Sequence, residues 1–333
     1  MSPSLSSTTS SLTPYITAAF GGNLLQNTPY GFTSLSRNKI NRIIIYSGSF
    51  NPPHIKHAKI IREALQVCRS DYGLVGFVLL PDFDDILRKK LEDAHEALFL
   101  PYETRSAMLR QHASPADELT RLPSNTWVYE HPSMMDEVPN AGQVPQAERS
   151  NKFLVKLKKL AAEDGYFIEF TGLCQPHESM PQLGMDTESN GGHVWDSYLI
   201  LGTKESVSWT PPAGHFSKHP QKFEMCDEWQ RVQSTDSESN NNSIPLPNYE
   251  NNDHFAIWEC CKTGTTNSYI RYVNLEFEPQ SLTSNQVRSV ARCIRKIRND
   301  EEQAEKELEE RIGRMVIGWD SLRDDPAWRE WLA

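Results

Sequence analysis

Short apolar runs, separated by polar and glycine-containing segments, recur through the central part of the chain. Their length and their content of β-branched residues are typical of strands buried on both faces of a parallel sheet. Apolar residues also recur at helical spacing between some of these runs, as in residues 148–164. The alternation predicts an α/β fold with a doubly wound, mostly parallel sheet. The candidate strands are residues 43–46, 74–80, 126–130, 166–172, 197–204, 255–261 and 269–275.

Two segments outside this pattern are predicted to be disordered. Residues 1–36 are rich in serine and threonine and contain no lysine or arginine, and residues 233–253 are polar and of low complexity. Neither segment has enough apolar residues to offset the loss of chain entropy on folding. The remainder divides into one domain over residues 37–298 and a C-terminal segment over residues 299–333.

The C-terminal segment is predicted to be a charged helix with one apolar face. We expect this face to pack on the domain, and packing on a second copy of the chain in a homo-oligomer is the alternative. The residues of the apolar face are Leu308, Ile312, Met315, Trp319 and Leu322.

Charge and hydropathy narrow the classes of function. The 333 residues include 34 lysines and arginines and 44 aspartates and glutamates, which gives a formal net charge of −10. Non-specific nucleic-acid binding needs a basic surface, so nucleic acid is not an expected partner. No apolar run reaches the roughly 20 residues of a membrane span. The N-terminus also lacks the features of a signal peptide, so we expect a cytoplasmic or nuclear protein that does not bind membranes.

One stretch combines the features of a phosphate-binding loop. The apolar run 43–46 leads into Gly48-Ser-Phe-Asn-Pro-Pro-His-Ile-Lys-His57, and apolar residues at helical spacing follow. Pro52 and Pro53 restrict the backbone and remove donors, so a loop is predicted between a strand and a helix. Loops at the carboxyl ends of parallel strands, next to helix N-termini, bind phosphates in α/β proteins.

This stretch resembles the G-x-F-x-P-x-H-x-G-H signature of the nucleotidylyltransferase superfamily. Ser49 and Asn51-Pro52-Pro53 make it most similar to the nicotinamide/nicotinate mononucleotide adenylyltransferases. The resemblance implies a Rossmann-like fold and transfer of AMP from ATP to nicotinamide or nicotinate mononucleotide, with release of pyrophosphate. One position departs from the signature, because Lys56 stands where the family usually has glycine.

A second segment, Leu282-Thr-Ser-Asn-Gln-Val-Arg288, is similar to the I-S-S-T-x-I/V-R motif of the same superfamily. The resemblance implies that Thr283, Ser284 and Arg288 hold the β- and γ-phosphates of ATP. The hydroxyl residues also suit an ordinary capped helix with no ligand. The second motif follows the first along the chain, as it does in the family.

The resemblance assigns roles within the first signature. Gly48 and Ser49 would let backbone amides approach phosphate, and Phe50 belongs to the same phosphate-binding set. His54 and His57 would donate hydrogen bonds to the α- and β-phosphates, with imidazolium character adding charge stabilisation.

Outside the signature histidines, the resemblance implies further contacts with the substrates. Lys56, despite its departure from the family pattern, is expected to contact a phosphate. Lys89 and Lys204 match basic residues of the family that lie near the triphosphate, although Lys89 also suits a solvated helix face. Trp127 matches a tryptophan close to the nicotinamide ring, where indole can stack on a flat cation, although a core position is the plain alternative.

Magnesium is the expected cofactor, bridging phosphate oxygens with few protein ligands. Histidines at positions 177, 193, 215 and 219 lie in loop sequence without cysteine support, and we expect no metal centre there.

One further departure leaves alternatives open. Gly172-Leu173-Cys174 stands where the family usually has Gly-x-Asp, so the aspartate is missing. A different acceptor, as in the cytidylyltransferases or the pantetheine-phosphate adenylyltransferases, would keep both motifs. A nucleotide-binding relative with little catalytic activity is the other alternative.

Overall fold

The computed structural model describes residues 11–19, 34–68, 73–95, 98–110, 122–129, 146–176, 195–202, 208–211, 218–224, 226–232, 255–263, 269–275, 283–297 and 300–332. The chain forms two compact units, Met1–Phe170 with Gln280–Ala333 and Thr171–Pro279. The sequence had placed residues 37–298 in one domain. The division arises because the second segment has an aromatic core of its own, while the last fifty residues pack with the first unit.

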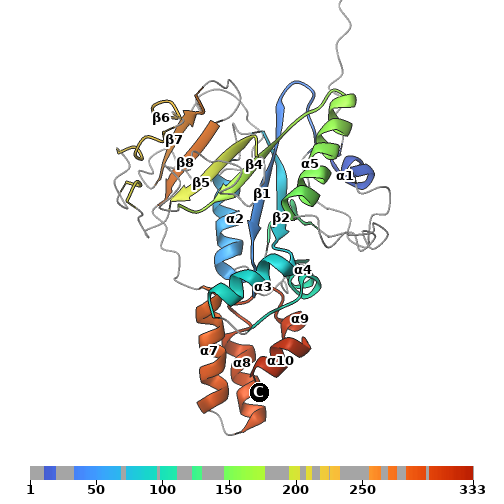
Figure 1. The fold of residues 1–333 in the computed structure, drawn as a ribbon, viewed down its shortest axis with the longest axis vertical. Coiled ribbons are helices and arrows are strands. Elements are labelled where there is room, and N and C mark those ends of the chain that lie inside the picture. Colours follow the sequence, from blue (N-terminus) through green and yellow to red (C-terminus); the bar gives the residue numbers. More distant parts are fainter. Residues whose placement is uncertain are drawn as a thin grey trace, which may run out of the picture. The chain divides into compact units, whose positions relative to one another are not determined.

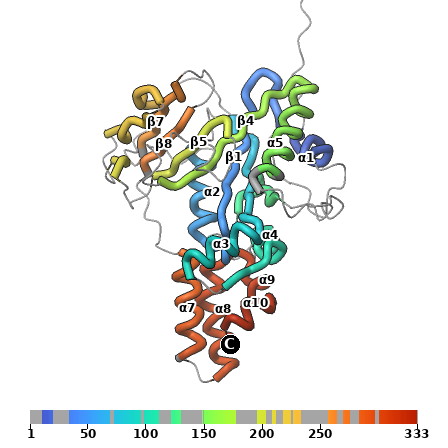
Figure 2. The backbone as a smooth tube through the Cα atoms, viewed as in Figure 1, coloured from blue at the N-terminus to red at the C-terminus, as the bar shows by residue number. Residues whose placement is uncertain are grey.

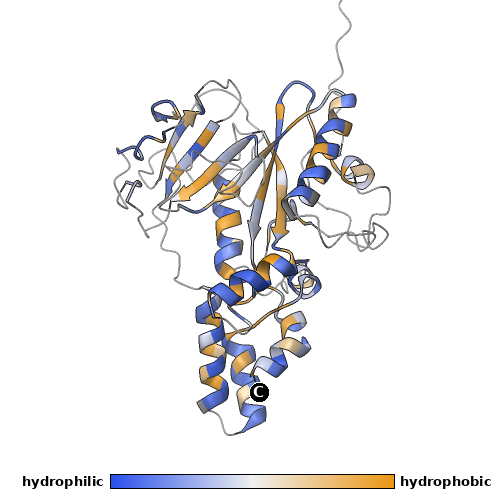
Figure 3. Cartoon of the chain, viewed as in Figure 1, coloured by the Kyte–Doolittle hydropathy of each residue, from blue (hydrophilic) through white to orange (hydrophobic). Residues whose placement is uncertain are grey.

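The first unit is built on parallel strands. β1 and β2 pair in parallel, β2 pairs in parallel with the short β3, and α2 connects β1 to β2, as the sequence predicts. Nearly every residue of β2 is buried, which explains its continuous apolar run, and much of it is orange in Figure 3. These elements are β1 (Ile40–Gly48), α2 (Ile55–Val67), β2 (Leu74–Pro81) and β3 (Thr126–Val128), and Figure 1 shows β1 and β2 beside each other.

The part of this unit before β4 (Phe167–Cys174) also contains α1, α3, α4 and α5, and α1 corrects the sequence analysis. Tyr15 and Ile16 of α1 are buried, and the Tyr15 hydroxyl donates to the Asp164 carboxylate at 2.6 Å. Disorder was therefore the wrong prediction for residues 11–19, because a few apolar residues in the polar segment find a place against α5. The helices are α1 (Thr13–Ala19), α3 (Asp84–Asp93), α4 (Tyr102–Arg110) and α5 (Gln146–Glu163).

The second unit begins with the last residues of β4. β4, β5 and β8 are parallel, and β7 and β6 add antiparallel pairs. Aromatic rings of Trp209, Phe223, Trp229 and Tyr272 form its core. The strands are β4 (Phe167–Cys174), β5 (Ser197–Gly202), β6 (Gln230–Arg231), β7 (Phe255–Cys261) and β8 (Tyr269–Leu275).

The eight described strands follow the order β3-β2-β1-β4-β5-β8-β7-β6. The predicted α/β class with an open, mostly parallel sheet is therefore confirmed. The polar segment 233–253 lies outside the described residues. No helix among the described residues has the length and apolar character required to cross a membrane.

The C-terminal segment forms several short helices rather than the single one predicted. Gly318, with φ 71°, begins α9, and Pro326 begins α10, so the chain turns twice where a continuous helix was expected. Leu308, Ile312 and Leu322 are buried in one cluster with residues of α4 and α7, so the apolar face packs on its own unit. The helices of the segment are α8 (Glu301–Arg311), α9 (Trp319–Arg323) and α10 (Pro326–Leu332). They follow α7 (Ser284–Ile297), and Figure 2 traces all four beyond the end of β1.

Residues 315–317, between α8 and α9, contact the loop that follows β1. The Ile55 N–H donates to the Met315 carbonyl at 2.9 Å, and the Ile317 N–H donates to the Pro53 carbonyl at 3.0 Å. His54 and Val316 form an antiparallel bridge between these two bonds. We call residues 315–317 the C-terminal strap. It holds the backbone on both sides of His54.

Gly318 is predicted to keep the strap in place. A Cβ there would lie 2.4 Å from the Met108 carbonyl oxygen, in addition to the cost of a left-handed conformation. Gly318→Ala should therefore lower the free energy of unfolding by roughly 2–4 kcal/mol in urea titrations. Hydrogen exchange at the Ile55 and Ile317 amides should become faster.

Gly165→Ala is the matched control, because Gly165 also has positive φ but open space around a Cβ. Its free energy of unfolding should fall by only about 1–2 kcal/mol, the cost of the left-handed conformation. Equal losses in the two variants, with unchanged exchange at Ile55, would contradict a role for Gly318 in holding the strap.

Candidate functional site

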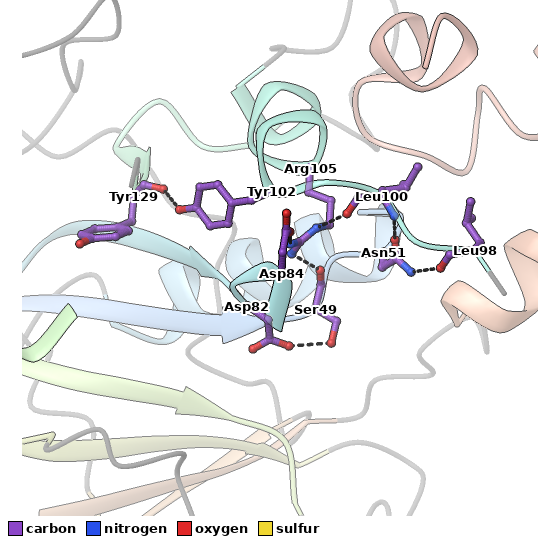
Figure 4. Close-up of polar contacts among 9 residues, drawn as sticks. All are labelled: Ser49, Asn51, Asp82, Asp84, Leu98, Leu100, Tyr102, Arg105 and Tyr129. Atoms are coloured by element: carbon purple, nitrogen blue, oxygen red, sulfur yellow. Dashed lines mark hydrogen bonds and ion pairs between the residues drawn. The ribbon is translucent and has the colours of Figure 1, made fainter. Parts of the chain in front are cut away.

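The loops after β1 and β2 are joined at the carboxyl ends of these parallel strands. The Asp82 N–H donates to the Gly48 carbonyl at 2.9 Å, and the Ser49 hydroxyl donates to the Asp82 carboxylate at 2.7 Å. Lys90 of α3 donates to the same carboxylate oxygen at 2.7 Å. The start of the signature loop, residues 48–57, is therefore fixed to the loop after β2, as Figure 4 shows for Ser49 and Asp82.

Asn51 is the buried centre of the signature loop. Its side-chain amide donates to the Leu98 carbonyl at 2.8 Å and accepts from the Leu100 N–H at 3.0 Å (Figure 4). One short segment, residues 98–100, thus satisfies both hydrogen-bonding groups of the Asn51 side chain. A hydrophobic residue in place of Asn51 would leave the Leu98 carbonyl and the Leu100 N–H without these partners. The sequence analysis noted Asn51 only as part of the family signature and gave it no role.

Arg105 of α4 is a second buried support that the sequence analysis missed. Its guanidinium donates to the carbonyls of Leu100 and Ser49 at 2.8 and 2.9 Å and to the Asp84 carboxylate at 2.8 Å. Figure 4 shows these groups converging between the loop and α4. Burial lowers the pKa of Arg105, whereas Asp84 opposes that shift. The sequence signal that could have found it is an arginine three residues before Met108 in a predicted helix.

Phe50 has a left-handed backbone conformation, with φ 47°. A non-glycine residue pays about 1–2 kcal/mol for this conformation. Its buried ring packs edge-on against Tyr46 and lies 4.8 Å from the His57 ring. Strained backbone of this kind tends to occur at functional sites, where packing holds it.

His54 and His57 lie against each other at the start of α2, with ring centroids 3.9 Å apart. The His54 N–H donates to Nδ1 of His57 at 3.1 Å. In a neutral ring this bond places the proton of His57 on Nε2, so Nε2 can donate to a ligand. Nδ1 of His54 is buried without a hydrogen-bond partner. The pair thus combines one ring of defined tautomer with one buried nitrogen that lacks a partner.

Both imidazoles are uncharged at neutral pH. Burial, reinforced by the charges of Lys56 and Arg288, lowers the pKa of His54 to about 3. Burial also lowers the pKa of His57 well below its usual value, and His54 and Lys56 act in the same direction. Burial disfavours the charged form in the ligand-free site, so the expected imidazolium character stays a prediction for the site with an anion bound.

Lys56 is half-buried in the first turn of α2. Its side chain makes no hydrogen bond or ion pair with another residue in the described part of the chain. Its charge is nevertheless close enough to both histidines to lower their pKa values. The ammonium group is thus near the rings, and its contact with a phosphate stays a prediction.

The second motif begins α7 and reaches the signature loop. Nη1 of Arg288 donates to the Asn51 carbonyl at 2.6 Å, and the Ser284 hydroxyl donates to the Pro52 carbonyl at 3.2 Å. Thr283 instead caps the helix, because its hydroxyl accepts from the Gln286 N–H while the Gln286 side chain accepts from the Thr283 N–H. The structure therefore brings Ser284 and Arg288 to the loop and assigns Thr283 a local capping contact.

Other site residues named from the sequence lie elsewhere. Lys89 is exposed on α3, and its neighbour Lys90 makes the contact with Asp82. Trp127 is buried in β3, where its ring packs on Tyr129 and Phe153 in the core. Lys204 lies outside the described residues.

The segment that replaces Gly-x-Asp lies inside β4 rather than in a loop. A Cβ at Gly172 would lie 2.5 Å from Cδ1 of Trp195, so ring packing explains the glycine. Burial raises the pKa of the Cys174 thiol to about 12, so the position of the missing aspartate carries no negative charge.

Within the described residues, no group of three or more histidines, cysteines or acidic residues is placed to hold a metal ion. His177, His193 and His215 lie outside those residues.

The buried histidines should make stability depend on pH. The unfolded state binds protons near pH 6.5, and the folded state does so only at much lower pH, so acidification below 6.5 favours unfolding. His54 alone should lower the free energy of unfolding by about 2 kcal/mol between about pH 7 and pH 5.

Urea titrations at both pH values test this, with His54→Asn as the variant that cannot titrate. The loss on acidification should be smaller in the variant by that amount. Parallel losses in the two proteins would show that His54 keeps an ordinary pKa.

Comparisons with known proteins add little. No protein-family model matches the sequence, and no curated protein matches it. Similar solved structures include the Plasmodium falciparum nicotinic acid mononucleotide adenylyltransferase complexed with APC and with NaAD, with TM-scores of 0.28 and 0.27 and identities of 10% and 12%. Each match covers 50% of this chain and 65% or 66% of the Plasmodium chain, less than two thirds of its length.

A protein of Vibrio parahaemolyticus described as a nicotinate-nucleotide adenylyltransferase matches with a TM-score of 0.22 and 17% identity. That match covers 49% of this chain and 73% of the Vibrio chain. Likenesses of this strength carry no argument about activity. The chemistry of the site therefore rests on the geometry of its own residues.

Proposed function

We propose that the protein transfers AMP from ATP to nicotinamide or nicotinate mononucleotide and releases pyrophosphate. The observation that carries the proposal is the contact between the two motifs. Arg288 and Ser284 bind the carbonyls of Asn51 and Pro52 across 237 and 232 residues of sequence. A helix that needed only a cap would not require these contacts, because Thr283 and Gln286 already supply the cap.

The reaction requires positioning rather than a covalent intermediate. A phosphate oxygen of the mononucleotide attacks the α-phosphorus of ATP in line, and the bond from the α-phosphorus to the β-phosphate oxygen breaks. Pyrophosphate leaves with the electron pair of that bond. The protein must hold two anions together and stabilise charge on the phosphoryl oxygens in the transition state.

The histidine pair suits the phosphoryl oxygens. Nε2 of His57 is a donor of fixed tautomer, because its Nδ1 is occupied by the His54 N–H. Nδ1 of His54 has no hydrogen-bond partner in the described part of the protein. If the His54 ring is protonated, this nitrogen can donate to a phosphate oxygen and gain one. A bound anion favours protonation of His54, whose Nδ1 is without a partner among the described residues, so nucleotide binding is expected to take up a proton.

Positive charge at the loop comes from Arg288, Lys56 and the N-terminus of α2. Arg288 is buried and tethered to the loop, so its charge is held near the site at small entropic cost. The helix terminus adds partial positive charge that favours phosphate. Lys90 compensates the Asp82 carboxylate, which would otherwise repel an anion at the start of the loop.

Magnesium fits this site as an ion that arrives with the triphosphate. Asp82 is the carboxylate nearest the start of the loop, and its Oδ2 is already shared by Ser49 and Lys90. Phosphate oxygens would supply most ligands, and the bound ion would neutralise charge on them.

The acceptor assignment has its own basis in the sequence. It rests on the form of the signature, Ser49 with Asn51-Pro52-Pro53, since Trp127 has core packing partners. The uncharged Cys174 thiol at the position of the missing aspartate favours the second candidate, a nucleotide-binding relative with little activity.

The first test of the proposal is pyrophosphate release. Purified protein with ATP and magnesium should release pyrophosphate when nicotinamide or nicotinate mononucleotide is added, and the dinucleotide should form in equal amount. Turnover only with phosphopantetheine or with a cytidylyltransferase substrate pair would refute the acceptor. ATP binding without turnover on any acceptor would favour the second candidate.

A pair of substitutions separates the two nitrogens of His57. His57→Asn keeps an acceptor near Nδ1 for the His54 N–H but removes the Nε2 donor, and it should lower kcat by at least about 100-fold with little loss of stability. His57→Gln keeps a donor near Nε2 and loses the cap.

The glutamine variant should therefore be less stable in urea titrations and retain more activity than the asparagine variant. The reverse ranking, with asparagine active and glutamine inactive, would assign His57 to helix capping alone.

A further inference from the structure

The outer face of α7 carries a basic hollow that the proposed reaction does not use in full. The hollow has a volume of about 280 Å³. Three of its residues are cations one helical turn apart, Arg288, Arg292 and Lys296, and none is acidic. Its lining residues are Asn285, Arg288, Ser289, Arg292, Cys293 and Lys296.

Arg292 and Lys296 differ from those cations on other helices that form ion pairs with acidic residues four positions away. Glu148 pairs with Lys152 on α5, and Glu307 pairs with Arg311 on α8. Within the described part of the chain, Arg292 and Lys296 form no ion pair. The nearby acids of α8 are directed to Arg295, which contacts Glu301 and Glu305.

A row of like charges four residues apart destabilises a helix. The row is also unusual in a protein with a net charge of −10. An anionic ligand would remove this repulsion, whereas a solvated helix face of ordinary composition would alternate the signs. The basic row is therefore better explained by an anion than by solubility.

Two of the three cations are held in place before any ligand arrives. Arg288 is buried and bonded to the Asn51 carbonyl. The Arg292 guanidinium lies over the Trp331 ring, 4.4 Å from its centre. Stacking occupies the face of the guanidinium and leaves its edge N–H groups for an anion, so less side-chain entropy is lost on binding.

The length of the row selects an extended ligand. Arg288 and Lys296 are eight residues apart, about 12 Å along the helix axis. A single phosphate cannot contact both ends, whereas a chain of linked phosphates can. We infer that the hollow on α7 binds a polyphosphate chain, supplied either as free inorganic polyphosphate or as the phosphate tail of a nucleotide.

This site goes beyond the proposed reaction and shares only Arg288 with it. In the described part of the chain, Arg292 and Lys296 form no hydrogen bond or ion pair with the signature loop, and the proposed adenylyl transfer assigns them no part. The inference can therefore be tested while the motif residues stay intact.

Cys293 provides a direct probe, because its exposed thiol lines the hollow, while the exposed Cys261 on β7 is an internal reference. Iodoacetamide, which is uncharged, is applied to the full chain, and alkylation of each cysteine is followed by peptide mass spectrometry. Tripolyphosphate at about ten times its Kd should slow alkylation of Cys293 about tenfold, with no change at Cys261. Orthophosphate at equal ionic strength should have no effect.

The double variant Arg292→Gln/Lys296→Gln should lose this protection. The control variant Lys152→Gln/Lys156→Gln, which removes the same charge from α5, should keep it.

Protection by tripolyphosphate identifies free polyphosphate as sufficient, and protection by ATP alone assigns the site to a nucleotide tail. No protection by either, or equal loss in the two double variants, would overturn the inference. Pyrophosphate release by the wild-type protein is unaffected by these outcomes and tests the proposed function separately.

Discussion

The site depends on the buried main chain of the signature loop and on the groups that satisfy it. Asn51 is the clearest example, because its side chain and its carbonyl bind three different partners. A buried carbonyl or amide without a partner costs more than an ordinary hydrogen bond contributes, so these contacts fix the loop in one conformation. The strained conformation of Phe50 and the stacked histidines can persist only because the loop is held on both sides.

The fold class could be predicted because buried strands leave a strong local signal. β2 reads as a continuous apolar run, and β7 and β8 begin and end where their apolar residues do. The errors arose where tertiary contacts override composition. α1 is ordered because Tyr15 and Ile16 find a surface on the same unit, and nothing local to residues 1–36 encodes that surface. The C-terminal helix ends at Arg311 and the next one starts only after Gly318, where the apolar spacing alone suggests continuity.

The residues of the candidate site also divide into those that a local sequence pattern identifies and those that only tertiary contacts reveal. His54, His57 and Arg288 could be named from the sequence because each belongs to a motif with chemical meaning. Arg105 was missed because its three bonds go to carbonyls and to Asp84, and a contact with a main-chain atom leaves no trace in the partner's residue type. Charge states are likewise invisible in the sequence. Burial lowers the pKa of both histidines in the ligand-free site, and their residue type alone gives no sign of that burial.

The C-terminal strap has a consequence for how the protein acquires its site. Val316 pairs with His54 although most of the chain separates them in sequence. Closing so long a loop is entropically costly, and contacts of this separation tend to form after local ones. The strands and α2 can therefore assemble before the signature loop is fixed in one conformation. A chain arrested at that stage would carry the whole signature and still lack a rigid candidate site, so the affinity for any ligand of this site would report whether folding has been completed.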